Sequence, residues 1–379
     1  MQRKQSAILV LCLCVLAGRG AAASAAEPEP APVFELQDLF KSVRIPKIVV
    51  AADGTVLAFA KSCHLIRRST DGGKTWSPAA EVGPDAHGNA LVDANTGHVL
   101  VVPGRGHLWR SRDHGKTWHR EATTIKPNAA GYGSAESGVP VNTHCSESGI
   151  TLRHGKHQGR LLMPARYQPP KGNNGQKWWP FNCNCAIYSD DGGKIWQVSS
   201  PVQSGTGEGT LAELADGRIY YNSRCHMAID HRRRIAWSHD GGHMWTDWYV
   251  SEHLREVGQP FYFKYGTKPS YGCNAGLVRM PNEVTGGKDV LLFSTPDNPG
   301  GSRVRMTVWA SFDGAKTWPL KRLVWKGPSA YSSLAAGKDG TVYLLFERGR
   351  KKLHENISVA RFNLDWLAQR RDWRTRLKH

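Results

Sequence analysis

The stretch STDGGKTW at residues 69–76 decides the fold, because the chain repeats it. Four related octapeptides follow it: SRDHGKTW at 111–118, SDDGGKIW at 189–196, SHDGGHMW at 238–245 and SFDGAKTW at 311–318. The Asp accepts hydrogen bonds from nearby backbone N–H groups, and Gly supplies the positive φ of a tight turn. The Trp buries a large aromatic surface beneath that turn. Five copies, each preceded by a strand-like run, indicate a repeated supersecondary unit.

A second repeat consists of a Gly-containing turn followed by an apolar strand. Its six copies are DGTVLAFA (53–60), TGHVLVVP (96–103), QGRLLMPA (158–165), DGRIYYNS (216–223), GKDVLLFS (287–294) and DGTVYLLF (339–346). The glycines of successive copies are 43 to 70 residues apart, a spacing that suits four-stranded antiparallel blades. The sequence therefore predicts an all-β fold, a six-bladed β-propeller formed by residues 41–379. Residues 364–377 have helical spacing and predict a basic C-terminal helix packed on its side.

The N-terminus is typical of a secretory signal peptide over residues 1–26. Arg3 and Lys4 precede an apolar run that is too short to span a bilayer, and small residues follow. A membrane anchor is the alternative for this run. We expect a secreted or periplasmic protein with no membrane span in the mature chain, and a leader at 27–40.

The cysteines and the net charge limit which cofactors and partners are expected. Six cysteines follow the signal peptide, which permits disulfides without fixing their pairing. Cys183 and Cys185 flank one residue, but no second pair has the spacing of a zinc site, so neither a metal nor another cofactor is expected. The formal charge of +18 favours anionic partners such as acidic glycans. Export and the absence of a nucleic-acid-binding motif argue against nucleic acid, and oligomeric state is not predicted.

Strand direction places the candidate site residues on one face. We name the strand before each Gly turn A, the strand after it B, and the strand entering the Asp turn C. Because antiparallel strands alternate in direction, the Gly turns and Asp turns share a bottom face. The starts of A, the ends of B and the starts of C share the opposite, top face, where polar side chains should line the axis. The Asp turns cannot contribute to a site there.

The top positions form an unusual set of side chains: Arg44, Glu208, Arg224, Arg303, Tyr331 and Glu347. Three arginines that converge on an axis repel one another unless an anion binds among them, and the guanidinium fork suits a carboxylate. The alternative is three separately paired surface arginines.

Several segments resemble the exo-α-sialidase family in the family's own order, across essentially the whole mature chain. They are VRIP (43–46), the five Asp turns, EGTLAELADGR (208–218) with NSR (222–224), SRVRMTVWASFDG (302–314), GPSAYSSL (327–334) and LLFERG (344–349). Single Asp turns occur in many unrelated propellers, whereas the combination of these motifs is specific.

The resemblance implies a role for each top residue. Arg44, Arg224 and Arg303 would hold the C1 carboxylate of a sialic acid, and Glu347 would orient Arg44. Tyr331 would be the nucleophile at C2, with Glu208 as its base. A phenol of ordinary pKa about 10 needs such a base, and nearby arginines are expected to favour the phenolate. Retaining hydrolysis of terminal α-linked sialic acids from sialylated glycoconjugates follows by resemblance.

The chain departs from the family in the top loop of the first blade. The family carries its acid/base Asp there, but Lys61-Ser62-Cys63-His64 contains no carboxylate. His87 and Asp85, in the next top loop, are the first replacement candidates, because His suits proton transfer near neutral pH. A histidine that binds only substrate or solvent is the alternative. His64, His144 and Glu147 are also expected at the top, and Trp178-Trp179 in the insertion 168–184 are candidates for a sugar-binding wall.

Two further functions remain open on the sequence. One is an exo-glycosidase for a related 2-keto acid sugar with an altered acid. The other is a sialic-acid-binding propeller that lost turnover with the Asp loop, although such a binder needs only the arginines and not Tyr331 and Glu208.

Overall fold

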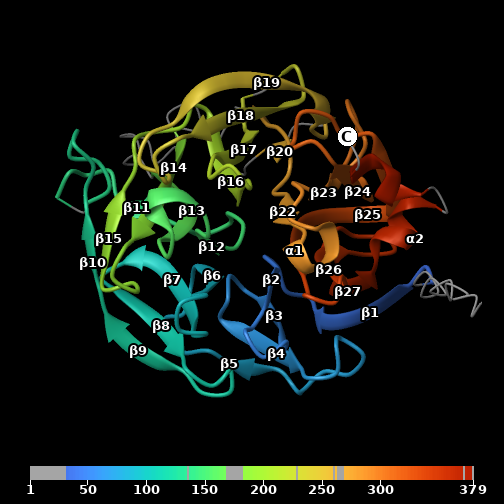
Figure 1. Ribbon diagram of the computed structural model, residues 1–379, viewed down its shortest axis with the longest axis horizontal. Coiled ribbons are helices and arrows are strands. Elements are labelled where there is room, and N and C mark those ends of the chain that lie inside the picture. Colours follow the sequence, from blue (N-terminus) through green and yellow to red (C-terminus); the bar gives the residue numbers. More distant parts are fainter. Residues whose placement is uncertain are drawn as a thin grey trace, which may run out of the picture. The chain divides into compact units, whose positions relative to one another are not determined.

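Strand pairing organises the chain into a succession of small, mostly antiparallel sheets. The computed structural model describes residues 31–379 except 135, 168–181, 228, 259–260, 263–268, 370–371 and 378–379. The chain divides into two units, Met1–Ala31 and Pro32–His379. Within the second unit, the sheets follow one another around a common centre (Figure 1), which confirms the predicted all-β propeller architecture. The predicted signal peptide and Trp178-Trp179 lie outside the described residues.

Three of the sheets contain four strands each. The first comprises β2 (Lys47–Val50), β3 (Val56–Ala60), β4 (Leu65–Ser69) and β5 (Ala80–Glu81). The second comprises β6 (Asn89–Val92), β7 (Val99–Arg105), β8 (His107–Ser111) and β9 (His119–Ala122). The third comprises β16 (Thr206–Glu213), β17 (Ile219–Cys225), β18 (Arg232–Ser238) and β19 (Thr246–Arg255).

Two sheets are larger. One has β10 (Thr124–Lys126), β15 (Ile195–Val198), β14 (Cys183–Ser189), β13 (Leu161–Tyr167) and β11 (Val141–Asn142), with β12 (Ile150–Thr151) also on β13. The other runs β1 (Phe34–Lys41), β27 (Asn356–Phe362), β26 (Val342–Arg348), β25 (Leu320–Ala336), β24 (Val304–Ser311), β23 (Leu291–Pro296) and β22 (Gly276–Arg279). A short ribbon pairs β20 (Phe261–Tyr262) with β21 (Pro269–Ser270).

The prediction of six separate four-stranded blades is not confirmed in that form. The reason is β25, which is continuous over 17 residues. Its first part pairs with β24 from Leu320 to Pro328, and its second part pairs with β26 from Ser329 to Ala336. Two groups of strands therefore merge into the seven-stranded sheet, where the sequence predicted a break between blades.

Both ends of the domain differ from the prediction. Residues 27–40 were expected to be a leader, but Phe34–Lys41 form β1, which pairs antiparallel with β27. Leu39 and Phe40 are buried, and this burial accounts for a strand in place of a solvated leader. The expected helix over 364–377 is divided into α2 (Leu364–Ala368) and a 3-10 helix (Trp373–Leu377). The left-handed backbone of Gln369, with φ of 54°, ends α2.

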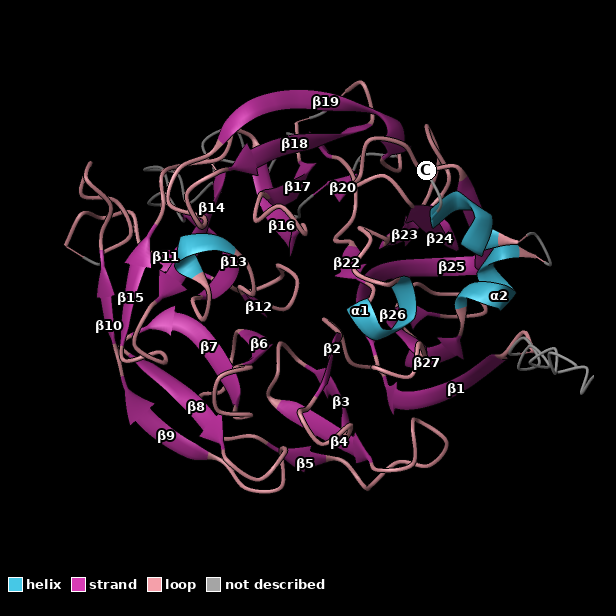
Figure 2. Cartoon of the chain, in the orientation of Figure 1, coloured by secondary structure: helices cyan, strands magenta, loops and turns pink. Residues whose placement is uncertain are grey.

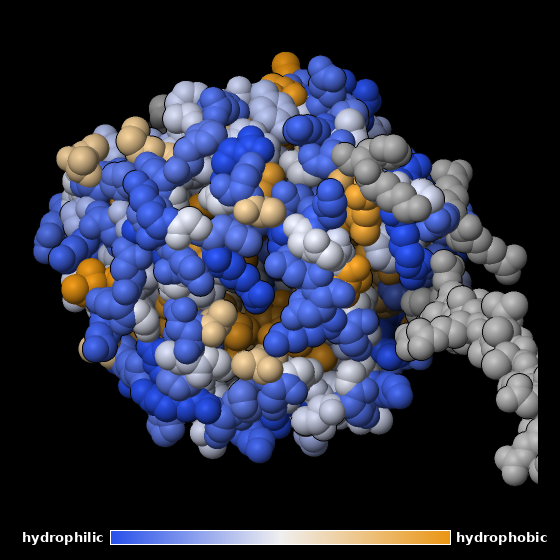
Figure 3. Space-filling model, in the orientation of Figure 1, coloured by the Kyte–Doolittle hydropathy of each residue, from blue (hydrophilic) through white to orange (hydrophobic). Residues whose placement is uncertain are grey.

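Apolar side chains pack between neighbouring sheets. One cluster joins Leu57 and Phe59 of β3 to Val99 and Val101 of β7, and similar clusters lie between the other sheets. Figure 2 shows strands around the whole ring with only short helices, among them α1 (Asn282–Thr285). On the face displayed in Figure 3 most side chains are hydrophilic. Among the described residues, no helix has the length and apolarity that a bilayer crossing needs.

The Asp turns have the hydrogen bonds that their sequence predicts. In the first, Asp71 Oδ1 accepts from the backbone N–H groups of Lys74 (3.1 Å) and Thr75 (3.0 Å). Ser69 Oγ donates to Asp71 Oδ1 at 2.7 Å. The Gly turn at Asp53 lies next to the second Asp turn, with Asp53 Oδ1 3.6 Å from His114 Nδ1. This contact agrees with the prediction that both kinds of turn share one face.

We expect the tryptophans of the Asp turns to contribute unequally to stability. Trp196 is fully buried at 0% exposure, whereas Trp76 is half-buried. Trp196→Ala should lower the free energy of unfolding by roughly 3–5 kcal/mol, because it leaves a large cavity. Trp76→Ala should cost clearly less in the same denaturant titration. Equal losses in the two variants would contradict this difference in packing.

Candidate active site

Tyr331 and Glu208 meet inside the ring although they are far apart in sequence. The Tyr331 hydroxyl donates a hydrogen bond to Glu208 Oε1, and both side chains are buried. Tyr331 lies on β25 where the register with β26 shifts between Ser329 and Ser332. Glu208 follows a similar shift in the pairing of β16 with β17. Such bulges re-aim side chains, and here they accompany the contact between the two strands.

Arg224 completes a buried triad with this pair. Its Nη1 donates to Glu208 Oε2 at 2.6 Å and to the Tyr331 hydroxyl at 3.2 Å. Its Nε donates to the carbonyl of Tyr271 at 2.7 Å, which fixes the plane of the guanidinium. Arg224 therefore holds both reacting groups of the predicted nucleophile–base pair.

Glu347 anchors the other side of Tyr331. Its carboxylate accepts from Arg44 Nε at 3.1 Å, from the Ile45 backbone N–H at 2.9 Å and from the Tyr331 backbone N–H at 3.1 Å. His354 Nδ1 lies 3.1 Å from the same carboxylate. Burial alone would raise the pKa of Glu347, but His354, Arg44 and these donors lower it to about 2. Glu347 is therefore ionised, and it pairs with Arg44 and with the backbone N–H of Tyr331.

The three predicted arginines surround the Tyr331 ring. The guanidinium carbons of Arg44 and Arg303 lie 5.0 and 5.7 Å from its centroid, and Arg224 contacts its hydroxyl. Arg303 donates to the Gly272 carbonyl at 2.8 Å. The structure thus brings the arginines together and does not distribute them over the surface. The fork geometry of a guanidinium group suits a carboxylate, so an anionic ligand fits this arrangement of charges.

Tyr331 keeps its proton, although the neighbouring arginines favour the phenolate as expected. Burial and the negative charge of Glu208 raise the pKa of Tyr331 well above 10, against the opposing effect of Arg224 and Arg303. The arginines therefore do not produce a resting phenolate. For Glu208, burial raises the pKa but the charge of Arg224 outweighs it, so the pKa lies below its ordinary value. A neutral phenol that donates to a carboxylate is the arrangement in which that carboxylate acts as base.

The top loop of the first blade is a tight turn of the backbone. Lys61, Ser62 and Cys63 all have φ between 51° and 68°, the left-handed region. The Lys61 N–H donates to the Arg44 carbonyl at 2.7 Å, so β3 turns directly into β4 beside the arginine. No acidic side chain is present in this turn.

The two replacement candidates differ in where they point. Asp85 is turned toward β8 and β9, where it accepts from Trp109 Nε1 at 2.8 Å and Arg120 Nε at 3.0 Å. Slight burial raises the pKa of Asp85, but these donors lower it by more, so the pKa lies below its ordinary value and Asp85 is ionised. The structure gives its carboxylate no contact with Tyr331 or Glu208. We therefore withdraw Asp85 as a proton donor.

His87 contacts a second histidine, His144, that lies at the edge of the site. Its ring stacks on His144 with a centroid distance of 4.5 Å and an interplanar angle of 17°. His144 Nδ1 lies 2.7 Å from Ser62 Oγ. Burial lowers the pKa of His144 to about 3, and the charge of Glu208 opposes that shift. Burial and the charges of Arg105 and His64 lower the pKa of His87.

Sequence reasoning missed Arg166, the last arginine of β13. It is buried, its Nη1 donates to the Gly207 carbonyl at 3.1 Å, and its charge lowers the pKa of Glu208. A signal was present, because Arg166 directly follows QGRLLMPA at the end of a B strand. Arg224 and Glu347 occupy the same position in their own blades and were found by that rule.

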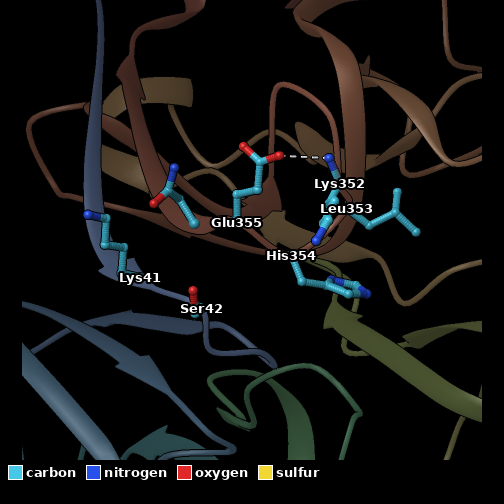
Figure 4. Close-up of a pocket in the computed structure, with 7 residues that line it drawn as sticks. Lys41, Ser42, Lys352, Leu353, His354 and Glu355 are labelled. Carbon is cyan, nitrogen blue, oxygen red and sulfur yellow. Dashed lines mark hydrogen bonds between the residues drawn. The ribbon is translucent and has the colours of Figure 1, made fainter.

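A hollow of about 530 Å³ opens beside Glu347. Figure 4 shows its lining residues: Lys41, Ser42, Lys352, Leu353, His354, Glu355 and Asn356. His354 joins this hollow to the anchored Glu347 carboxylate. Lys41 and Lys352 add cationic groups at its edge, which suits the approach of an anionic ligand.

The chain is similar to known proteins over most of its length. The family described as BNR repeat-like domain matches residues 101–344. The chain belongs to that family. A sialidase of Micromonospora viridifaciens is 30% identical over 391 aligned residues, which cover 89% of this chain and 55% of that relative. The chain thus spans about half of that relative's length.

Solved structures support the same fold. The structure of the Hadza microbial sialidase Hz136 has a TM-score of 0.67 at 24% identity and covers 86% of this chain and 66% of its own. The intramolecular trans-sialidase from Ruminococcus gnavus, solved with oseltamivir carboxylate, has a TM-score of 0.65 at 16% identity, covering 87% and 96%. The resemblance to sialidases drawn from the sequence motifs is confirmed by these relatives.

Glu147 is a further buried carboxylate at the top, and it should make stability pH-dependent. Its Oε1 accepts from Ser333 Oγ at 2.5 Å, and burial raises its pKa to about 7 despite the charge of Lys47. Its favourable contribution is complete below its unfolded pKa of about 4.3 and is lost as the pH rises through about 7.

The free energy of unfolding should therefore fall by roughly 1–3 kcal/mol between pH 5 and 8 from this group. Glu147→Gln should remove that part of the slope in urea titrations at several pH values. The exposed Glu283 supplies a control, and Glu283→Gln should keep the wild-type slope. An unchanged slope in Glu147→Gln would refute this assignment.

Proposed function

We propose that the protein is a retaining exo-α-sialidase that hydrolyses terminal α-linked sialic acids of glycoconjugates. The hydrogen-bonded Tyr331–Glu208 pair within the three arginines carries this proposal. The family relatives that are sialidases support the same substrate class.

In the first step, Arg44, Arg224 and Arg303 hold the substrate carboxylate beside the ring of Tyr331. Glu208 takes the phenolic proton as the Tyr331 oxygen forms a bond to C2, and the bond from C2 to the leaving oxygen breaks. A neutral nucleophile suits this place, since a carboxylate would face the carboxylate of the substrate at short range. A water then attacks C2 and gives its proton to His87, the bond from C2 to the Tyr331 oxygen breaks, and Glu208 returns its proton to that oxygen. The configuration at C2 is therefore retained.

Proton delivery to the leaving oxygen is assigned to His87. The turn at Lys61–Cys63 offers no carboxylate, whereas His87 stacks against His144 at the edge of the site. Because its pKa lies below the ordinary 6.5, the imidazolium that donates is populated only in acid.

A purely sialic-acid-binding protein is the weaker alternative, because carboxylate binding does not need the buried Tyr331–Glu208 contact. An exo-glycosidase for another 2-keto acid sugar would use the same arginines, and the missing acidic loop keeps that alternative relevant. The signal peptide and the secreted or periplasmic location stay predictions from the sequence.

Replacing the nucleophile tests the proposal directly. Tyr331→Phe should lower kcat on an aryl sialoside and on sialyllactose by roughly 10³-fold or more. Tyr188→Phe is the matched control, since Tyr188 lies on β14 and bonds to His243. Binding of sialic acid without turnover by the wild type on either substrate would overturn the enzyme assignment.

Replacing His87 tests the proton donor. His87→Ala should depress sialyllactose hydrolysis by roughly 10²-fold and aryl sialoside hydrolysis much less, because a good leaving group needs little acid. The wild-type kcat on sialyllactose should fall as the pH rises through the lowered pKa of His87, and the variant should lose that fall. His239→Ala, in an exposed Asp turn, should behave as wild type. Equal losses on the two substrates would exclude His87 as the acid.

A further inference from the structure

Two adjacent backbone carbonyls hold arginines of the site. The Tyr271 carbonyl accepts from Arg224 Nε at 2.7 Å, and the Gly272 carbonyl accepts from Arg303 Nη2 at 2.8 Å. An acceptor at a fixed place restricts the plane of a guanidinium that sits on a long, flexible stem. Two of the three arginines around the phenol are therefore oriented by one short backbone segment, residues 271–273.

The third carbonyl of this segment binds an arginine that belongs to a buried ion pair. The Cys273 carbonyl accepts from Arg233 Nη1 at 3.0 Å, and the same Nη1 donates to Glu256 Oε1 at 2.6 Å. The other carboxylate oxygen, Glu256 Oε2, accepts from the Cys273 N–H at 3.1 Å. Arg233 Nε donates to Asn222 Oδ1 at 2.6 Å, which connects the pair to β17. Both side chains of the ion pair are 0% exposed.

The Glu256 carboxylate also lies directly against Gly272. A Cβ at this position would lie 2.6 Å from Glu256 Cδ, and the backbone has a φ of 74°, in the left-handed region. Glycine suits both conditions. The N–H groups of Tyr271 and Gly272 donate to the carbonyls of His226 (2.9 Å) and Val257 (3.3 Å). All three N–H groups of the segment therefore have partners, and Glu256 holds the last of them.

Stability alone does not explain this ion pair. Taking two charges out of water is costly, and apolar side chains of similar volume often stabilise a core equally well or better. An apolar pair would supply neither an acceptor for the Cys273 N–H nor a donor to its carbonyl. The charged pair thus fixes the position of a backbone segment, and that segment contacts two arginines of the site.

We propose that Glu256 and Arg233 are positioning residues for substrate binding. Through the backbone of residues 271–273 they set the directions of Arg224 and Arg303, and with them the place of the substrate carboxylate. The inference rests on the proposed sialidase function. It adds to the three arginines a buried pair that acts on the substrate only through the backbone.

Glu256→Gln tests the inference, because it keeps the shape of the side chain and removes its charge. The dissociation constant of free sialic acid and KM for an aryl sialoside should both rise roughly 10-fold or more. The kcat should change less, since the carboxylate is bound both before and during the reaction. In an Arg303→Ala background the same substitution should add clearly less, because one of the groups through which it acts is gone.

Glu213→Gln is the matched control. Glu213 is a buried carboxylate at the end of β16, where it accepts from the backbone N–H groups of Arg153 (2.7 Å) and His154 (3.0 Å). This variant should lose thermal stability while the dissociation constant and KM stay those of the wild type. A merely structural role of Glu256 would give the same result as this control. If Glu256→Gln does not fold, Glu256→Asp replaces it, because the shorter side chain keeps the charge beside Arg233 and draws its oxygens back from Cys273.

The outcomes separate this inference from the proposed function. Wild-type constants in a folded Glu256 variant would overturn the inference and leave the sialidase assignment intact. If the wild type binds sialic acid without turnover, the enzyme assignment fails, and the dissociation constants alone decide the inference. If the wild type neither binds sialic acid nor hydrolyses the aryl sialoside, the proposed function fails, and the inference fails with it.

Discussion

The carboxylate of Glu347 is the constraint on which the site depends. It is fully buried, and it accepts hydrogen bonds from the Arg44 guanidinium and from the backbones of Ile45 and Tyr331. These donors come from the first and the last parts of the domain. One anion therefore fixes the distance between Arg44 and Tyr331 by pairing with both, and these two residues are the carboxylate-binding arginine and the nucleophile of the proposed mechanism. A buried carboxylate is stable only with such partners, so the loss of one donor would affect all the others.

The other side of Tyr331 is held in the same way. Arg224 bridges Glu208 and the phenol, so the positive charge that binds the substrate carboxylate in the proposed mechanism also keeps Glu208 ionised. This explains how a carboxylate of lowered pKa serves a phenol of raised pKa. The hydrogen bond between them is already formed, and in the proposed mechanism the proton moves only when the phenolic oxygen attacks.

The sequence predicted much of this arrangement, since strand direction and turn chemistry follow local rules. Repeated Ser, Asp, Gly and Trp fixed the turns, and alternation of strand direction placed Arg44, Arg224, Arg303, Glu208, Tyr331 and Glu347 on one face. The prediction from the sequence failed where contacts between distant parts of the chain determine the structure. The continuity of β25 depends on its packing with both neighbours, and the strand at Phe34–Lys41 exists because a partner lies at the other end of the chain.

The difference between local rules and long-range contacts also explains the wrong predictions within the site. Asp85 is two residues from His87 in sequence, but only the fold shows that Trp109 and Arg120 donate hydrogen bonds to its carboxylate. The protonation of Tyr331 depends on burial, which no spacing rule gives. Arg166, in contrast, could have been predicted from the sequence. It lies at the end of a B strand, which is the position that identified Arg224.

The pairing of β1 with β27 imposes an order on folding. The Val33 N–H bonds to the Asn363 side chain across 330 residues of sequence, and the first strand synthesised takes its place beside the last. At roughly 5–20 residues per second, the ribosome needs on the order of 15–70 s to span that interval. Throughout it, the ring is open and β1 has no partner strand. Closure is therefore a late, long-range event that depends on the finished chain, and chaperone binding during synthesis would act on an incomplete ring.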